Sequence, residues 1–127
     1  MCSPSTHDMS PIRLWWEEMK EAEKARFFYH ELGLSGQMPA TCEPWIAEKI
    51  LEQHLNWETM WVVLPMQDIL AINEELRREN AEEERINVPA NPQHYWRYRL
   101  HLDLEELIDE IDFNERLKQM VAHSRRR

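Results

Sequence analysis

Glycine is scarce in this sequence, which holds only Gly33 and Gly36 among its 127 residues. Typical usage near 7% would give about nine glycines in a chain of this length. Few glycines, together with many Glu, Leu and Lys residues, favour helix. The length suffices for one ordinary domain, and we expect its regular structure to be mostly helical.

Cysteines and long apolar runs are also lacking. Cys2 and Cys42 do not form a metal-type pair, and two thiols do not make the disulfide framework of a secreted protein. No apolar run approaches the roughly 20 residues of a membrane span, and the N-terminus does not resemble a signal peptide. We therefore expect a soluble, cytoplasmic chain that has no membrane partner and uses neither a metal nor a cofactor.

Basic residues are fewer than acidic residues in this sequence. The chain has 15 basic and 24 acidic residues, a formal net charge of −9, and its last three residues are all arginine. Without that tail the net charge is −9 − 3 = −12. Such a surface repels phosphate backbones. Arg97 and Arg99 beside Trp96 are the only candidates for a compensating basic patch, so we expect no nucleic-acid partner.

Residues 11–32 carry apolar side chains at the i, i+3, i+4, i+7 spacing of a helix. Asp8 or Ser10, just ahead of this segment, would cap such a helix well. Residues 32–39 contain both glycines and predict a turn. A second helix is predicted to follow, with Pro44 in its first turn.

Two short helices are predicted near the C-terminus. Asp103 and Asp112 each precede apolar residues at helical spacing, and each is followed three residues later by a glutamate. This pattern is typical of a capping box. Residues 124–127 should fray. His54, on the apolar face of the helix that follows Pro44, is better explained as a packed side chain than as a ligand.

Residues 59–64, Thr-Met-Trp-Val-Val-Leu, form a short and nearly all-apolar run that ends at Pro65. The run lacks the alternation of a half-solvated strand and is typical of a strand buried on both faces, as in parallel sheets covered by helices. A parallel strand needs neighbours, and no other segment has comparable strength. The run is therefore either a short core helix or one strand of a sheet that lies mostly outside the chain. We favour the second interpretation.

Residues 85–99 are predicted to be neither helix nor strand, because Pro89 and Pro92 remove backbone donors and favour extended conformations before them. This segment nevertheless carries Tyr95, Trp96 and Tyr98. Its rings could pin a loop against a larger core. Alternatively, a rigid aromatic loop with amide and guanidinium donors could form a binding surface for polar, ring-shaped molecules.

Three short motifs occur together in one order and spacing. The first is Ser5-Thr6-His7-Asp8-Met9-Ser10 with Trp15-Trp16-Glu17-Glu18, the second is Leu64-Pro65-Met66-Gln67-Asp68, and the third is Arg85-Ile86-Asn87-Val88-Pro89 with Tyr95-Trp96-Arg97-Tyr98-Arg99. In these motifs the chain resembles the C-terminal part of 4-α-glucanotransferases, also called amylomaltases or disproportionating enzymes, of glycoside hydrolase family 77. The branch that includes the plant cytosolic enzyme is the most similar.

The resemblance implies that the chain is the C-terminal fragment of an α/β fold, a (β/α)₈ TIM barrel, with residues 1–127 forming the last portion of the catalytic domain. Residues 5–8 would lie at the carboxyl end of the seventh strand, and residues 59–64 would be the eighth. Asp8, Gln67 and Asp68 would then lie beyond strand ends, where barrel enzymes build their active sites. Met1 precedes the first motif so closely that we expect a truncated N-terminus, with the missing part of the barrel encoded upstream.

The resemblance also implies an activity, the transfer of α-1,4-glucan segments between sugars such as maltose or maltodextrin with retention of configuration. Retention needs a carboxylate nucleophile and an acid/base roughly 5 Å apart, and in the family both lie upstream of the matched region. Asp8 corresponds to a third catalytic carboxylate, His7 to a histidine that binds a hydroxyl of the reacting ring, and Asn87 to a loop asparagine near the acceptor. Gln67 and Asp68 would be supporting or capping groups.

A different class of function fits the residues without the resemblance. The chain would then be a small non-catalytic helical module for protein interaction. In that interpretation Asp8 only caps a helix, and the aromatic loop is a docking surface.

Overall fold

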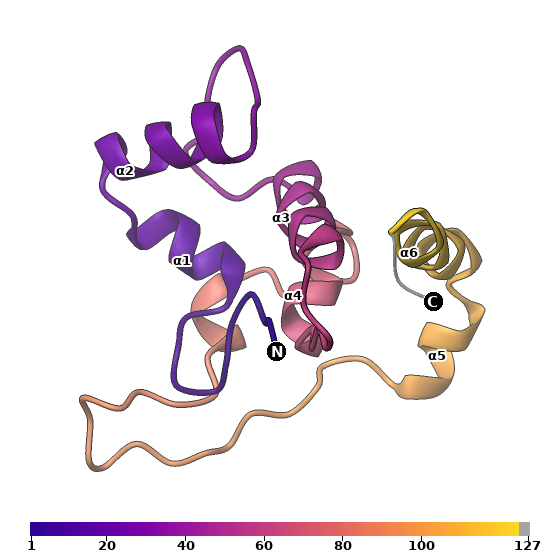
Figure 1. Ribbon diagram of the computed structural model, residues 1–127. Coiled ribbons are helices and arrows are strands. Elements are labelled where there is room, and N and C mark those ends of the chain that lie inside the picture. Colours follow the sequence, from indigo (N-terminus) through magenta and orange to yellow (C-terminus); the bar gives the residue numbers. More distant parts are fainter. Residues whose placement is uncertain (125–127) are drawn as a thin grey trace.

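The structure is a computed structural model, and it describes residues 1–124. Helices are the only regular elements in this part of the chain (Figure 1), as expected for the chain taken alone. They are α1 (Ile12–Glu18), α2 (Glu21–Arg26), the π-helix η1 (Phe27–Glu31), α3 (Pro44–Asn56), α4 (Met66–Leu70), the 3₁₀-helix η2 (Ala81–Glu84), α5 (Leu104–Asp109) and α6 (Ile111–His123). Residues 125–127, part of the segment predicted to fray, lie outside the described residues.

The predicted strand over residues 59–64 does not form in residues 1–124. Val62 instead makes a single isolated bridge with Cys2, and that bridge is parallel. The Cys2 N–H donates to the Trp61 carbonyl at 2.8 Å, and the Val63 N–H donates to the Cys2 carbonyl at 2.9 Å. A strand needs a continuous ladder, which one bridging residue cannot supply. The run is also not buried on both faces, because Trp61 is 67% and Val63 51% exposed.

The single helix predicted for residues 11–32 is wrong, because the chain breaks at Met19 and Lys20. These two residues have extended backbones, with ψ of 140° and 145°. The break brings Trp15 against Phe27, with ring centroids 5.0 Å apart in an edge-to-face arrangement. In one straight helix these residues, twelve positions apart, would be separated by about 18 Å. Aromatic packing therefore overrides helix propensity here.

The predicted turn and the start of the next helix are confirmed. Gly33 and Gly36 have φ of 63° and 93°, a backbone region that side-chain-bearing residues rarely occupy. Pro44 is the first residue of α3, where its missing N–H has no helical partner to lose. The turn lies within residues 32–43, which connect η1 to α3.

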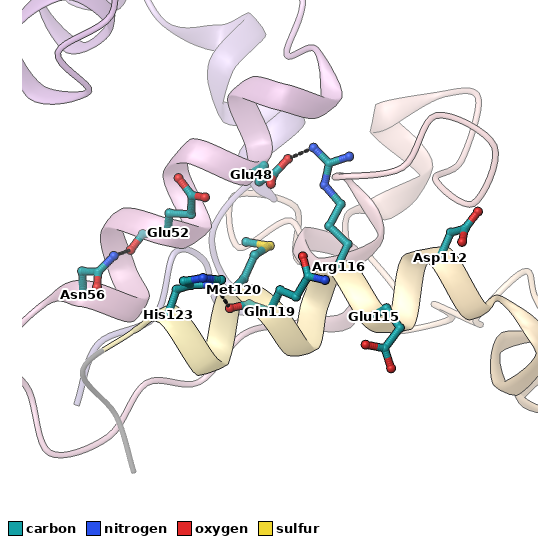
Figure 2. A pocket seen from close by; sticks show the side chains of 9 residues that line it. All are labelled: Glu48, Glu52, Asn56, Asp112, Glu115, Arg116, Gln119, Met120 and His123. Atoms are coloured by element: carbon teal, nitrogen blue, oxygen red, sulfur yellow. Dashed lines mark hydrogen bonds and ion pairs between the residues drawn. The ribbon is translucent and has the colours of Figure 1, made fainter.

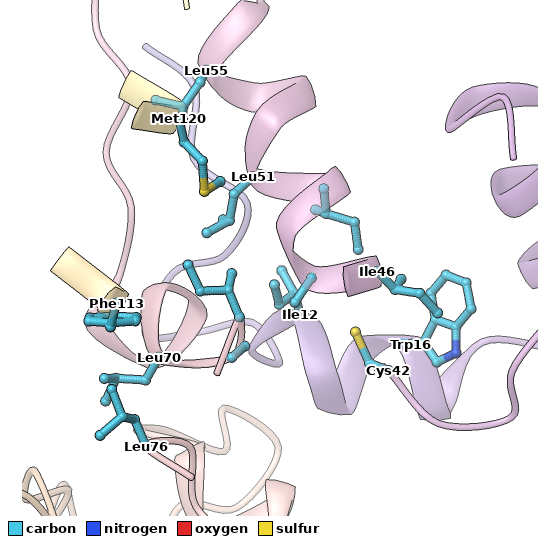
Figure 3. Packing of buried hydrophobic residues seen from close by; sticks show 14 of the residues in the cluster. Ile12, Trp16, Cys42, Ile46, Leu51, Leu55, Leu70, Leu76, Phe113 and Met120 are labelled. Carbon is cyan, nitrogen blue, oxygen red and sulfur yellow. The ribbon is translucent and has the colours of Figure 1, made fainter. Parts of the chain in front are cut away.

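Helix α3 lies at the centre of the hydrophobic core (Figure 3). Its residues Ile46 and Leu51 are completely buried, as are Trp16 from α1 and Phe28 from η1. Burying a side chain of this size contributes roughly 1.5–3 kcal/mol. Leu70 of α4, together with Phe113 and Met120 of α6, extends the same cluster. The core thus joins elements from both ends of the chain.

Helices α5 and α6 are present, but the predicted caps are only partly right. Asp103 is the N-cap residue of α5, without a side-chain cap hydrogen bond. The N-cap residue of α6 is Glu110, so that Asp112 lies inside the first turn. Asn114 explains the early start of α6, because its side chain donates to the Leu107 carbonyl at 2.7 Å and so supports the end of α5. The two helices therefore follow each other almost directly.

Candidate active site

Two loops that are far apart in sequence meet at Asp8 and Asn87. The first is the N-terminal loop, residues 3–11, and the second is the aromatic loop, residues 85–99, which contains neither helix nor strand, as predicted. Asn87 Nδ2 donates a hydrogen bond to Asp8 Oδ1 at 2.7 Å. Two of the predicted site residues are therefore in direct contact.

His7 completes the contacts of the Asp8 carboxylate. Its Nε2 lies 3.2 Å from Asp8 Oδ2, so that the two carboxylate oxygens have different partners. The side chains of His7 and Asp8 are 51% and 53% exposed. A carboxylate oxygen has room for a further hydrogen bond beyond one protein donor. The group is therefore held in place and still open to a ligand.

Asp8 does not cap helix α1, which excludes the capping role weighed for it and for Ser10. The N-cap position of α1 is Pro11, and Ser10 donates instead to Glu18 at 2.6 Å. The first N–H of the helix, that of Ile12, donates to Asp68 at 2.8 Å. The carboxylate that supports the start of α1 thus comes from α4.

Asp68 is fully buried under the N-terminal loop. It accepts hydrogen bonds from the Ser5 hydroxyl and from the Ile12 N–H, which lie on either side of His7 and Asp8 in sequence. Burial raises the pKa of Asp68 above its ordinary 3.8, and the hydrogen bonds from Ser5 and Ile12, together with the charge of His54, only partly oppose this. Through these contacts Asp68 joins the N-terminal loop to the first turn of α1.

Gln67, the neighbour of Asp68, supports the other loop. Its side-chain amide donates to the Glu84 carbonyl at 3.3 Å, three residues before Asn87. Glu84 is itself buried and forms an ion pair with Arg13, which also donates to the Arg78 carbonyl at 2.7 Å. Burial raises the pKa of Glu84 against the opposing effect of Arg13. Adjacent residues of α4 therefore hold both loops that meet at Asp8 and Asn87.

Most rings of the aromatic loop are exposed and do not pack against the core. Tyr95 and Trp96 are 71% and 60% exposed, and Arg97 lies over the Tyr95 ring at 5.1 Å. Tyr98 alone is half-buried, beneath Arg78 at 5.6 Å. Trp96 contacts His7, with ring centroids 4.8 Å apart. Of the two interpretations, an exposed aromatic surface beside polar groups describes this loop better.

A separate hollow lies between α3 and α6, as Figure 2 shows. Its volume is about 590 Å³, and an ion pair between Arg116 and Glu48 crosses it. Its lining is mostly acidic and amide side chains from these two helices. None of the predicted site residues belongs to that lining, so the hollow is not part of the cluster around Asp8.

Residues 1–124 contain neither a cluster of metal-ligating side chains nor a membrane-spanning helix. No three or more His, Cys, Asp or Glu side chains of this region come together as a metal site would require. Within the same residues, no helix combines the length and apolar character needed to cross a membrane.

Comparison with known proteins identifies the family. The family model described as 4-alpha-glucanotransferase matches residues 1–105. The chain belongs to this family, glycoside hydrolase family 77. A rice (Oryza sativa subsp. japonica) 4-alpha-glucanotransferase DPE2 is 40% identical over 126 residues, which are 99% of this chain and 13% of the relative. The 4-alpha-glucanotransferase of Aquifex aeolicus is 30% identical over 99 residues, 78% of this chain and 18% of the relative.

A third member of the glucanotransferase family, from Chlamydia muridarum, is 31% identical over 123 residues, covering 93% of this chain. The chain spans only 13–22% of the length of these three relatives. No solved structure matches the chain. All the predicted site residues lie within the matched residues 1–105, whereas α6 lies beyond them.

Sequence reasoning missed several residues of this site. Ser5 donates to the buried Asp68, and Arg13 forms a buried ion pair with Glu84. Trp96 contacts the ring of His7. The motifs contained Ser5 and Trp96 but gave no sign of their contacts. Arg13 and Glu84 carried no signal at all, because an ion pair between such distant residues depends on how the helices pack.

Proposed function

We propose that this chain forms the C-terminal part of the active site of a 4-α-glucanotransferase that transfers α-1,4-glucan segments with retention of configuration. The observation that carries the proposal is the Asp8 carboxylate, held by Asn87 on one oxygen and by His7 on the other, and half-exposed. Family membership supports an α-glucan as the class of substrate, and we propose a maltodextrin-type sugar.

Asp8 acts as the third catalytic carboxylate in this proposal. A retaining reaction passes through an oxocarbenium-like transition state, which needs a nucleophile and an acid/base on other parts of the barrel. Asp8 accepts hydrogen bonds from hydroxyls of the reacting ring, and its negative charge stabilises the positive charge that develops there. Asn87 and His7 fix the orientation of the carboxylate before the substrate arrives, so that no reorganisation is needed during the reaction.

His7 and Asn87 also face the substrate in this scheme. His7 binds a hydroxyl of the reacting ring, and Asn87 lies on the loop that approaches the acceptor sugar. Gln67 and Asp68 do not touch substrate. Their contacts with Glu84, Ser5 and Ile12 keep the two loops at a fixed separation. Such supporting contacts are what a precisely placed carboxylate requires.

The parallel bridge between Cys2 and Val62 supports the proposed barrel. Neighbouring strands of a TIM barrel are parallel, and the active site lies where their carboxyl ends emerge. The N-terminal loop with Asp8 follows Cys2, and α4 with Gln67 and Asp68 follows Val62. Both groups of residues therefore follow the carboxyl ends of the two bridged segments, which is where a barrel would have its active site.

A chimera tests the proposed function. The segment of the rice relative that matches this chain is replaced by residues 1–127. Glucan transfer between maltodextrins is then measured by the redistribution of chain lengths. We expect the chimera to transfer glucans, and the first product, followed by NMR, to keep the α-configuration. A folded chimera without transfer activity would favour the non-catalytic interaction module instead.

A further inference from the structure

Trp96 has an exposed indole next to the candidate active site. Trp16 is fully buried, whereas Trp96 is 60% exposed and lies on a loop rich in arginine. Trp57 and Trp61 are similarly exposed, at 61% and 67%, but Trp61 lies inside residues 59–64, the segment that would pair in the proposed barrel, and Trp57 lies just before it. Trp96 lies instead beside the polar cluster of the site.

The contact with His7 places the indole one side chain away from Asp8. The two ring centroids are 4.8 Å apart with the planes tilted by 46°, and the His7 Nε2 is 3.2 Å from the Asp8 carboxylate. The order in space is therefore an indole, an imidazole, a carboxylate and then the Asn87 amide. An apolar face thus borders a row of hydrogen-bonding groups.

Such a row matches the chemistry of a neutral sugar chain. A glucose unit has C–H groups on its faces and hydroxyl groups around its rim, so it can rest a face on an aromatic ring while its hydroxyls reach polar side chains. Aromatic side chains combine a large apolar surface with little conformational freedom to lose, which makes them effective contact residues. A phosphate group would gain nothing from the uncharged indole.

We propose that Trp96 is a glucan-binding residue that contacts the sugar unit next to the reacting ring, on the side of His7. The assignment of the side follows from the contact of the indole with His7, which lies on the other carboxylate oxygen of Asp8 from Asn87. The proposal rests on the function proposed for Asp8. Trp96 supplies an apolar platform for that unit, and His7, which touches the indole, links this platform to the reacting ring.

The test is an NMR titration of the 127-residue chain with maltotriose. The chain has six tryptophans, whose indole N–H signals are resolved with ¹⁵N labelling and assigned with single Trp-to-Phe variants. We expect the Trp96 signal to shift on addition of sugar. Trp57, with nearly the same exposed fraction, is the matched control and should not shift. A titration that leaves the Trp96 signal unmoved overturns the proposal.

Substitutions of Trp96 show whether its side chain itself contributes to sugar binding. The affinity is measured from the His7 ring signals in each variant. Trp96→Ala should weaken binding about tenfold, and Trp96→Phe, which keeps an aromatic face, by no more than about threefold. Trp57→Ala should bind normally. Equal affinity of the wild-type chain and Trp96→Ala contradicts a role in binding.

The chimera described above distinguishes the two proposals. An active chimera that is inactivated by Asp8→Asn, together with an unmoved Trp96 signal, overturns the Trp96 proposal alone. A shifted Trp96 signal with an inactive chimera overturns the catalytic function and leaves Trp96 as a sugar contact.

Discussion

Asn87 and Asp8 are 79 positions apart in the chain, and the Asn87 side-chain amide donates to Asp8 Oδ1 at 2.7 Å. The contact is exposed, so it adds little to the stability of the fold. What it does is to orient one carboxylate oxygen, while His7 orients the other. Substitution of Asp8 separates such a role in chemistry from a role in folding.

Asp8→Asn in the chimera should lower the rate of transfer by about two to four powers of ten, a loss of roughly 3–5 kcal/mol of transition-state stabilisation. Asparagine keeps the shape but removes the charge, so binding of a short maltodextrin should change little. The melting temperature should also stay the same, because Asp8 is half-exposed and does not cap α1. Asp109→Asn, an exposed acid on α5, is the control. Near wild-type turnover of Asp8→Asn would end the catalytic assignment.

The isolated 127-residue chain should be inactive on maltose and maltodextrin. The proposed mechanism needs a nucleophile and an acid/base that the resemblance assigns to other parts of the barrel. Incubation of the pure chain with maltotriose, followed by chromatography of the sugars, checks this expectation. Release of glucose, or a redistribution of chain lengths, would contradict the proposal that the nucleophile and the acid/base lie outside this chain.

The unfolding free energy should fall as pH rises above 3.8, the ordinary pKa of Asp68. Burial raises the folded-state pKa of Asp68, so between the ordinary and the raised value the folded chain holds a proton that the unfolded chain has released. Stability is therefore lost as pH rises through this window. Glu84, whose pKa is also raised by burial, acts in the same direction.

Asp68→Asn isolates the contribution of that group. It keeps an oxygen that can accept from Ile12 but removes the titration, so the decline of stability with pH should become shallower. Urea unfolding at a series of pH values measures the slope, and Glu105→Gln, an exposed position, is the control. An unchanged slope in Asp68→Asn would refute the assignment.

Only one of the two thiols should react readily in the folded chain. Burial raises the pKa of Cys42 to about 12, from an ordinary value of 9.0, whereas Cys2 is only partly buried. At pH 8 this change lowers the thiolate fraction of Cys42 roughly a thousandfold. Labelling with iodoacetamide, read by mass spectrometry of the intact chain and its peptides, should give fast modification at Cys2 alone. Equal rates at both positions would contradict the burial of Cys42.

The isolated chain should self-associate as its concentration rises. Met60 and Trp61 are 84% and 67% exposed, and Val63 beside them is 51% exposed. Exposed apolar side chains on a segment that makes one isolated bridge in place of a strand ladder favour association. Sedimentation velocity should show larger species in the wild-type chain and fewer in a Trp61→Lys, Val63→Lys double variant. Tyr95→Lys, which changes an exposed ring on the aromatic loop, should have no such effect, and a monomeric wild-type chain would argue against this surface.

Local signals predicted several elements correctly because the residues involved act within a few positions. Gly33 and Gly36 supply positive φ at the turn, and Pro44 begins α3 where a proline is tolerated. The break at Met19 and Lys20 had no such signal, since both residues suit a helix. It follows from the packing of Trp15 against Phe27, which no local pattern contains.

Residues 59–64 are nearly all apolar, but they do not form the predicted strand within residues 1–124. Strand structure depends on partners, and Cys2 provides one bridge only. The meeting of Asp8 with Asn87 could be anticipated from the family resemblance but not from spacing. The buried pair of Arg13 and Glu84 could be anticipated from neither, because charged residues are ordinarily on the surface.

The bridge between Cys2 and Val62 has a consequence for the order in which the chain folds. Joining positions 2 and 62 in an unstructured chain costs about 3–4 kcal/mol of loop entropy beyond a constant term. Its two backbone hydrogen bonds return only about 1–3 kcal/mol. The core around α3 must therefore assemble first and draw the two segments together. The Val63 amide should then exchange with solvent far faster than that of Ile50 in α3, through openings that release the N-terminal residues while the core stays intact.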